Sequence, residues 1–433
     1  MLHIGFVLPP DNQSFLPFRN QPLTPLYIFT ILEEKFGDKL DLSIIDLRGV
    51  RPENIKYYLP EKDVYLYTAM TPDYPDICEV KGLLNSIYPK ALHIAGGTHI
   101  NLFPDKSLQV FDSIVLGEGE EIIVQIIEDV LNRALKHIYK NTKLIDLNSY
   151  PYPLRKYLNL RAIAEKGLLR GSNISSFGTN VLFSRGCSFQ CKFCANLNFG
   201  PVRYRAPKLV EQEIEYLKKE YGVKVLALKD DNAIPLNKKI AKSFLESIGN
   251  TNVKWRGQSR ANGISEDIVK IAAEAGCSDL GIGIESVSPK VLKIINKKID
   301  LRKAKEYIEV LKKHGIGTRL HFILGLPGEP NDIASRTLDF INEADPKSVI
   351  LTVFTPYPGS EIFDSPKKFG LKKINPNWRG YQSAFGRFDE NEKPEMMFEY
   401  ESMTPWGKGI SNEKILENYS KLQAILRERK LIF

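Results

Sequence analysis

The 433-residue sequence contains no apolar run approaching the roughly 20 residues that a membrane-spanning helix needs. Its first residues, 1–7, show no basic region ahead of a small-residue cleavage site, so we interpret them as a buried first strand and not as a signal peptide. Together, these two features predict a cytoplasmic protein without a membrane span.

The sequence also lacks a long block of one charge. It has 60 Lys and Arg against 52 Asp and Glu, a net charge of +8, and the two signs are interspersed. A nucleic-acid-binding surface usually gathers its basic residues into a patch or stripe, so nucleic-acid binding is disfavoured. The positive excess would suit an acidic protein partner.

Cysteine is scarce, with five residues in the chain: Cys78, Cys187, Cys191, Cys194 and Cys277. The odd count argues against a disulfide framework, and three of the five fall within eight residues. Such a cluster favours a metal site in a reducing compartment. The two isolated cysteines are expected to behave as small buried apolar side chains.

Apolar runs alternate with helical patterns along residues 1–143. This alternation predicts βαβ units and a Rossmann-like parallel sheet, in an α/β protein of two or three domains. The expected strands are His3–Leu8, Leu42–Leu47, Val64–Ala69, Leu92–Ala95 and Ser113–Leu116, a helix over Glu121–Ile138 closes the domain, and residues 144–175 form a linker.

A second alternation predicts a partial (β/α)6 barrel of the TIM type over residues 176–368. Its expected strands are Asn180–Ser184, Val225–Lys229, Lys254–Arg260, Leu280–Glu285, Thr318–Gly325 and Ser348–Thr355. The remaining residues, 369–433, are rich in aromatic and Met side chains, from Trp378 through Phe385 and Phe388 to Trp406. They are expected to form a small C-terminal cap, acting either as a substrate wall or as a hydrophobic cluster.

Polar side chains alternate along two of these barrel strands. Lys254, Arg256, Gln258 and Arg260 share one face of the third strand, and Arg319 and His321 share one face of the fifth. Because a packed barrel lumen is apolar, polar faces predict an open interior that holds a ligand. Arg256, Arg319 and His321 are the candidate substrate contacts, and solvent-exposed edge strands are the alternative.

The three clustered cysteines are separated by three and two residues, so Cys187, Cys191 and Cys194 can converge on one centre from a single loop. Three thiolates leave a tetrahedral zinc ion one ligand short, and the nearest histidines in sequence, His137 and His314, are distant. An open position is instead what an iron–sulfur cluster needs if it binds a substrate at one iron. A non-catalytic zinc-binding scaffold remains the alternative.

The Cys-x3-Cys-x2-Cys spacing, with Phe193 before the last cysteine, resembles the motif of the radical S-adenosylmethionine (SAM) superfamily. The resemblance implies that these cysteines ligate a [4Fe–4S] cluster whose fourth iron binds SAM. Reductive cleavage of SAM then gives a 5′-deoxyadenosyl radical that removes a hydrogen from an unactivated carbon. A low-potential electron donor, ferredoxin or flavodoxin, is implied as a partner.

Further segments resemble the same family in the expected order. Residues 203–205 and Glu213 resemble the start of the first barrel helix, and residues 321–329 resemble the fifth strand, whose backbone touches adenine. The SAM contacts that the resemblance implies are Phe193, Asp231, Gln258, Ser259, Arg260, Glu285, Ser286, Gly325 and Leu326.

Residues 1–140 are similar to the cobalamin-binding domain that precedes the barrel in class B radical SAM proteins. The similarity rests on the glycine-rich strand ends, and the implied cobalamin contacts are Pro9, Thr68, Tyr74, Gly96, Gly97, Thr98, Gly117, Glu118 and Gly119. The sequence lacks the Asp-x-His-x-x-Gly motif that supplies an axial histidine. We therefore expect no histidine ligand, and Tyr74 is a hypothetical lower-face group.

This resemblance implies a C-methyltransferase that uses both SAM and methylcobalamin on an sp3 carbon. A cobalamin-associated oxidative cyclase or rearrangement enzyme, without methyl transfer, is the alternative. The substrate is expected to be an organic, peptide or lipid molecule whose identity the sequence does not specify.

Overall fold

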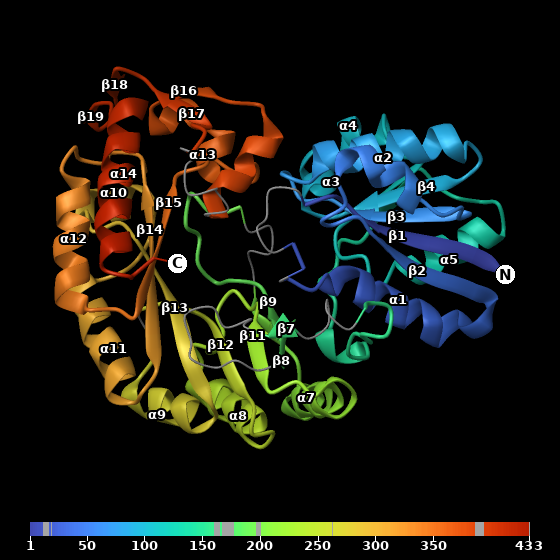
Figure 1. Cartoon of the computed structure of the whole chain (residues 1–433), viewed down its shortest axis with the longest axis horizontal. Helices are drawn as coiled ribbons and strands as arrows, with labels where there is room; N and C mark the ends of the chain where they lie inside the picture. Colours follow the sequence, from blue (N-terminus) through green and yellow to red (C-terminus); the bar gives the residue numbers. More distant parts are fainter. Residues whose placement is uncertain are drawn as a thin grey trace. The chain divides into compact units, whose positions relative to one another are not determined.

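The computed structural model describes every residue except 12–16, 19, 160–164, 167–176, 196–200, 262, 386–393 and 433. The chain divides into two compact units, residues 1–163 and 164–433 (Figure 1). The division falls within the segment predicted as a linker, much of which lies outside the described residues. Within the described ranges, no helix has both the length and the apolar character that a bilayer crossing requires.

The first unit is built on a parallel sheet of six strands, ordered β2-β1-β3-β4-β5-β6. Because the order reverses between β1 and β3, a crevice is expected at the carboxyl ends of these two strands. The strands are β1 (Leu2–Leu8), β2 (Leu40–Asp46), β3 (Val64–Thr68), β4 (Leu92–Gly96), β5 (Ser113–Leu116) and β6 (Ile138–Lys140). The helices are α1 (Leu23–Phe36), α2 (Tyr74–Ile87), α3 (Thr98–Leu102), α4 (Pro104–Leu108) and α5 (Ile123–Leu131).

Both faces of this sheet are buried, as the near-continuous apolar strands require. Phe6 and Leu66 pack on one face in a cluster that includes Phe29 of α1. Tyr65 packs on the other face in a cluster that includes Leu84 of α2. The prediction of a Rossmann-like parallel sheet is confirmed.

The predicted helix over Glu121–Ile138 is wrong in its C-terminal half. The helix ends at Leu131, and Arg133 adopts a left-handed conformation with φ of 55°. Ile138 then pairs with Ile114 as the start of the edge strand β6. A left-handed residue cannot continue an α-helix, so the chain turns and the β-prone pair Ile138-Tyr139 extends the sheet.

The second unit contains six parallel strands in the order β15-β14-β13-β12-β11-β8, with β7 antiparallel at the edge. Helices line the outer side of the curved sheet in Figure 1. The strands are β7 (Glu165–Lys166), β8 (Phe177–Val181), β11 (Val225–Leu228), β12 (Lys254–Ser259), β13 (Cys277–Glu285), β14 (Gly317–Leu324) and β15 (Ser348–Val353). The helices are α7 (Pro207–Tyr221), α8 (Lys238–Gly249), α9 (Glu266–Glu274), α10 (Pro289–Ile294), α11 (Leu301–Lys313) and α12 (Ile333–Ala344). The predicted partial barrel is confirmed.

Local signals in the sequence explain where several of these helices begin. In three helices, the side chain of the N-cap residue accepts hydrogen bonds from backbone N–H groups of the first turn. These residues are Asn237 for α8, Ser288 for α10 and Asp300 for α11. Each cap is worth about 1 kcal/mol relative to alanine. These caps fix the residue at which each helix begins, and therefore the length of the loop before it at the carboxyl edge of the sheet.

Two details of the barrel entrance differ from expectation. Arg203 and Tyr204 form strand β10 (Arg203–Tyr204), which pairs antiparallel with β9 (Ser184–Arg185). Their predicted place at the start of the first barrel helix is therefore wrong. The helix begins at Pro207, a residue suited to the first helical position, and Glu213 is buried within it.

The C-terminal residues form a small hydrophobic cap against the barrel. Its elements are α13 (Glu361–Asp364), β16 (Leu371–Ile374), β17 (Phe398–Tyr400), β18 (Met403–Thr404), β19 (Gly407–Lys408) and α14 (Asn412–Glu428). Tyr381, Met397 and Phe398 are buried in it. Phe388 and the side chain of Phe385 lie outside the described residues, so a substrate wall here stays a prediction.

Candidate functional site

The loop that carries the three clustered cysteines is anchored from two sides. The Lys192 N–H donates to the Ile295 carbonyl at 2.9 Å, and the Asn296 side-chain amide donates to the Gln190 carbonyl at 2.8 Å. On the other side, the Ile362 N–H donates to the Lys192 carbonyl at 3.1 Å. The segment after α10 and the start of α13 therefore hold the loop in place before any ligand binds.

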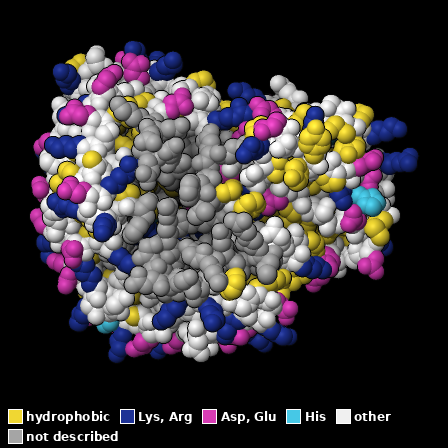
Figure 2. All heavy atoms as spheres, in the orientation of Figure 1, with side chains coloured by type: hydrophobic (Ala, Val, Ile, Leu, Met, Phe, Trp, Pro, Cys, Tyr) yellow, Lys and Arg dark blue, Asp and Glu magenta, His cyan; other side chains and the backbone are white. Residues whose placement is uncertain are grey.

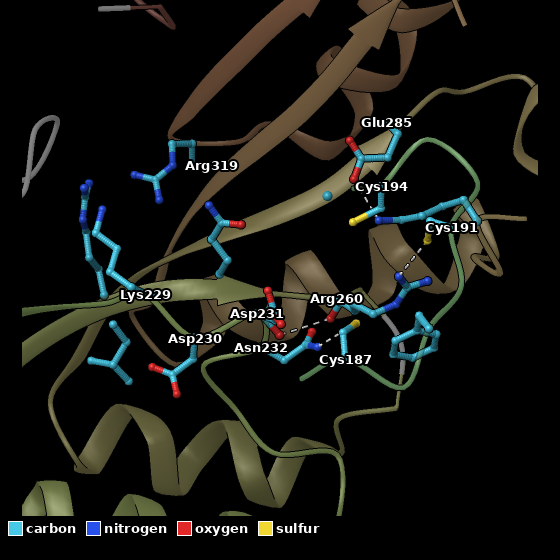
Figure 3. Close-up of a pocket in the computed structure, with 18 of the residues that line it drawn as sticks. Cys187, Cys191, Cys194, Lys229, Asp230, Asp231, Asn232, Arg260, Glu285 and Arg319 are labelled. Atoms are coloured by element: carbon cyan, nitrogen blue, oxygen red, sulfur yellow. Dashed lines mark hydrogen bonds and ion pairs between the residues drawn. The ribbon is translucent and has the colours of Figure 1, made fainter. Parts of the chain in front are cut away.

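All three cysteines line one cavity of about 310 Å³ in the barrel interior (Figure 3). Six of the nine residues predicted to contact SAM line the same cavity, from the loop and from the ends of β11, β12 and β13: Phe193, Asp231, Gln258, Ser259, Arg260 and Glu285. The structure thus brings together side chains that are far apart in sequence.

Polar groups already contact two of the three thiols. Arg260 donates to the Cys191 sulfur at 3.6 Å, and its guanidinium lies 3.6 Å from the centre of the Phe189 ring. The Asn232 amide donates to the Cys187 sulfur at 3.9 Å. These contacts leave a positive charge beside the Cys191 sulfur and an amide beside the Cys187 sulfur. Asn232 and Phe189 were not predicted as site residues, although the polar run after the second barrel strand was a signal for Asn232.

The three thiols of this cavity fit an iron–sulfur cluster with one open coordination position better than a structural zinc ion, which needs four protein ligands. Among the described residues that line the cavity, there is no histidine and no fourth cysteine. The described part of the chain also holds no group of three His, Cys, Asp or Glu side chains already gathered around one metal position. The three thiols share a cavity, and ligation would draw their side chains together.

A buried ion pair lies at the end of β13. The Glu285 carboxylate accepts from Lys297 Nζ at 2.8 Å, and both side chains are almost fully buried. The pairing of β13 with β14 shifts register between Gly283 and Glu285, where Glu285 has a φ of 68°. A left-handed Glu is uncommon, and such conformations cluster at functional sites. Lys297 was not predicted from the sequence.

Three of the predicted SAM contacts do not line this cavity. The Gly325 N–H donates to Glu329 Oε1, and the Gly325 carbonyl accepts from the Tyr400 hydroxyl, both at 2.8 Å. Leu326 and Ser286 are buried. Both backbone groups of Gly325 are bonded within the protein, and the predicted adenine contact there stays a prediction.

Two of the three predicted substrate residues, Arg256 and Arg319, line the cavity. His321 instead lies beside Arg319, whose Nε donates to His321 Nε2 at 3.4 Å. Burial, reinforced by neighbouring cations, lowers the pKa of His321 to about 3. The alternating burial of β14 confirms that Arg319 and His321 share one face of the strand.

The residues predicted to contact cobalamin lie at or after the carboxyl ends of the first unit's strands. Pro9 follows β1, Thr68 ends β3, Gly96 ends β4 and Gly117 follows β5. Parallel topology places these strand ends along one edge of the sheet, at the switch point where ligands of such sheets bind. The edge is therefore compatible with a bound cofactor.

Some of these residues have structural roles that account for their identity. A Cβ on Gly97 would lie 2.7 Å from the Ala69 nitrogen, and one on Gly117 would lie 2.1 Å from the Asn141 oxygen. Both glycines also have positive φ values. By contrast, a Cβ on Gly96 or Gly119 would meet only ordinary van der Waals contacts, so local packing does not require glycine at these two positions.

Three other predicted cobalamin residues lie close to these strand ends. The Tyr74 ring stacks on His99, with ring centres 3.9 Å apart. The Glu118 carboxylate accepts from the Ile145 N–H, and Thr98 begins α3. His99 is buried and its pKa is lowered to about 4 by burial. The contact between Tyr74 and a cofactor stays a prediction.

On the face that Figure 2 shows, the basic and acidic side chains of the described residues are interspersed. No stripe of one charge is visible among the described residues of that face. The prediction that disfavours nucleic-acid binding stays a prediction.

Comparison with known proteins identifies the second unit. Residues 181–341 match the model of the Radical SAM superfamily. The uncharacterized methyltransferase PH0819 of Pyrococcus horikoshii is 29% identical over 88% of this chain and 86% of its own length. The anaerobic magnesium-protoporphyrin IX monomethyl ester cyclase of Cereibacter sphaeroides is 26% identical, over 73% of this chain and 55% of the cyclase.

Among solved structures, the fold resembles that of TsrM from Kitasatospora setae, a radical SAM methyltransferase with cobalamin and a [4Fe–4S] cluster bound. The TM-score is 0.69, and the match covers 100% of this chain and 90% of that one, at 15% sequence identity. The likeness extends over both units and confirms the fold.

Proposed function

We propose that the chain, whose residues 181–341 match the Radical SAM superfamily model, is a cobalamin-dependent radical SAM methyltransferase that acts on an sp3 carbon of an organic substrate. The observation that carries this proposal is the cavity of Figure 3, where three cysteines of one anchored loop meet polar residues from three strand ends. A scaffold that held only a structural zinc ion would not require the polar residues that the strand ends add to the cysteines.

The residues of the cavity have separate roles in this proposal. Cys187, Cys191 and Cys194 hold the cluster, and Arg260 pairs with the carboxylate of SAM while supporting the Cys191 thiolate. Glu285, held by Lys297, accepts hydrogen bonds from the ribose hydroxyls. When bound, the cluster supplies the electron that cleaves SAM, and cobalamin carries the methyl group to be transferred.

Two observations support methyl transfer over cyclisation. PH0819 and TsrM, whose matches cover 88% and 100% of this chain, are named methyltransferases. The cyclase match leaves nearly half of the cyclase uncovered. The strand order of the first unit is compatible with a cobalamin-binding sheet, which both reactions would share. A low-potential protein such as ferredoxin or flavodoxin supplies the electron.

A substrate-free experiment tests the proposal directly. The protein is reconstituted anaerobically with iron, sulfide and cobalamin, reduced at low potential, and mixed with SAM labelled in its methyl group. We expect a brown protein that absorbs at about 400 nm. We also expect labelled cobalamin together with an equal amount of S-adenosylhomocysteine.

Each result has a defined meaning. 5′-Deoxyadenosine formation without any S-adenosylhomocysteine would exclude methyl transfer and favour the cyclase or rearrangement reaction. A colourless protein that binds one zinc ion would reject the radical SAM activity itself. A Cys194→Ala variant is the control, because its cobalamin should still bind while SAM cleavage to 5′-deoxyadenosine is lost.

A further inference from the structure

The floor of the cysteine cavity is shaped by glycines of β13. A Cβ on Gly281 would lie 2.9 Å from His321 Nε2 and 3.1 Å from Arg319 Nη2. A Cβ on Gly283 would lie 2.4 Å from Glu285 Oε1 and 3.0 Å from Lys297 Nζ, the two partners of the buried ion pair. Side chains at these two positions would therefore displace the basic groups of neighbouring elements from the lumen.

Three basic side chains from different elements form what we call the basic floor: Lys229 after β11, Arg256 on β12 and Arg319 on β14. In Figure 3, Lys229 and Arg319 lie on the opposite side of the cavity from the three cysteines. The cavity therefore has a thiol side, where SAM is expected, and a separate cationic side.

The Arg319 guanidinium is held in a fixed orientation. Its Nη1 forms an ion pair with Asp279 at 3.2 Å, and its Nε donates to His321. His321 is neutral at physiological pH, because burial and the nearby Arg319, Lys297 and Arg256 charges lower its pKa to about 3. Since a guanidinium has five N–H donors, donors remain after these two contacts.

The cavity as a whole has more positive than negative side chains. Five basic residues line it, Lys229, Arg256, Arg260, Lys297 and Arg319, against three acidic residues, Asp230, Asp231 and Glu285. Asp279 compensates part of this excess from below through its ion pair with Arg319. A partly buried excess of positive charge favours an anionic ligand, and guanidinium groups bind carboxylate and phosphate in bidentate geometry.

We propose that the basic floor binds a carboxylate or phosphate group of the methyl-accepting substrate, a proposal that rests on the proposed function. Anchoring the substrate at the floor places its remaining atoms toward the cysteine side of the cavity. The carbon that is methylated would then be separated from the anionic group by part of the cavity's width. The carboxylate of SAM has the same chemistry and is the competing occupant.

The test uses inorganic phosphate as the probe and the reconstituted, substrate-free enzyme saturated with SAM. Equilibrium dialysis with radiolabelled phosphate should show binding in the presence of SAM. Arg319→Gln and Arg256→Gln should each weaken phosphate binding by about tenfold or more, as expected for loss of a charged hydrogen-bond donor. SAM affinity and 5′-deoxyadenosine formation should change by less than about threefold.

Arg302→Gln is the matched control, because Arg302 is an exposed residue of α11 paired with Glu306. It should change neither phosphate nor SAM binding. Arg319→Lys keeps the charge and is expected to recover part of the phosphate affinity. If Arg319→Gln does not fold, as judged by circular dichroism, Arg256→Gln and Arg319→Lys still decide the outcome.

Three results would overturn the proposal. Phosphate that is displaced by SAM, or a tenfold loss of SAM affinity in Arg319→Gln, would assign the floor to the carboxylate of SAM. Absence of phosphate binding to the wild-type enzyme up to about 10 mM would reject an anion site. Wild-type enzyme that binds phosphate but never forms 5′-deoxyadenosine would instead contradict the proposed function and leave the anion site standing.

Discussion

At the scale of single residues, the site depends on a few contacts that the sequence does not display. Spacing alone predicted that Cys187, Cys191 and Cys194 act together. The contact between Arg260 and Cys191, and the ion pair between Glu285 and Lys297, depend on how β12, β13 and the segment after α10 meet in space. The sequence separation between the two partners does not reveal either contact.

Replacing Glu285 tests a SAM contact separately from the cluster. Glu285→Ala should weaken SAM binding by about tenfold or more, since it removes a charged acceptor and leaves Lys297 buried without its partner. Iron content should stay at the wild-type level. SAM affinity is measured by equilibrium dialysis and iron by colorimetric assay, and a loss of iron would show that Glu285 is structural.

Replacing Arg260 separates its two proposed roles. Arg260→Lys keeps a positive charge but loses the planar contact with Phe189 and the bidentate geometry, so SAM affinity should fall while the cluster still assembles. Arg260→Gln should reduce both SAM affinity and the amount of cluster that assembles. The cluster is measured by its absorbance and EPR signal. Equal SAM affinity in Arg260→Lys and the wild type would contradict a carboxylate contact.

At the scale of elements, much of the architecture was predictable. Alternating polar residues on β12 and β14 predicted an open lumen, because the period of two assigns each side chain to a face. The same reasoning failed at Ile138, where an apolar helical pattern runs on into an edge strand. At Arg203 the family resemblance, and not periodicity, led to the wrong element, because this residue lies in the two-residue strand β10 that pairs with β9.

The anchoring of the cysteine loop is testable at this scale. Asn296→Ala removes the side-chain donor to the Gln190 carbonyl and should destabilise the protein by about 1 kcal/mol, or about 2–4 °C in Tm. Cluster loss on dilution should also become faster. Asn252→Ala is the control, because Asn252 is exposed and has a left-handed φ of 55°, against 53° at Asn296, so both variants carry the same backbone strain. Unchanged cluster retention in Asn296→Ala would mean that the backbone contacts suffice.

At the scale of the whole molecule, both units present functional residues at the carboxyl ends of parallel strands. This common rule is why strand-end glycines and polar runs were informative in the sequence. It does not predict which strand ends are already used by the protein itself. At Gly325, for example, Glu329 and Tyr400 bond the backbone N–H and the carbonyl, and the sequence pattern does not display these contacts.

Glu329 makes the stability of the folded chain depend on pH. Burial raises its pKa to about 8 from an ordinary value of 4.5, so the folded state holds a proton that the unfolded state releases. Stability from this group is therefore complete below about pH 4.5 and declines as the pH rises toward 8, with a slope of at most about 1.4 kcal/mol per pH unit.

Glu329→Gln should remove this dependence, because the amide cannot ionise and its oxygen can still accept from the Gly325 N–H. The free energy of unfolding of the apo-protein, measured by urea titration between pH 6 and pH 9, should fall less steeply in the variant. The two proteins should differ most at the alkaline end, where the wild type must bury a carboxylate. Parallel pH profiles would show that Glu329 is already ionised in the folded protein, and its hydrogen bond to Gly325 would then be charge-assisted.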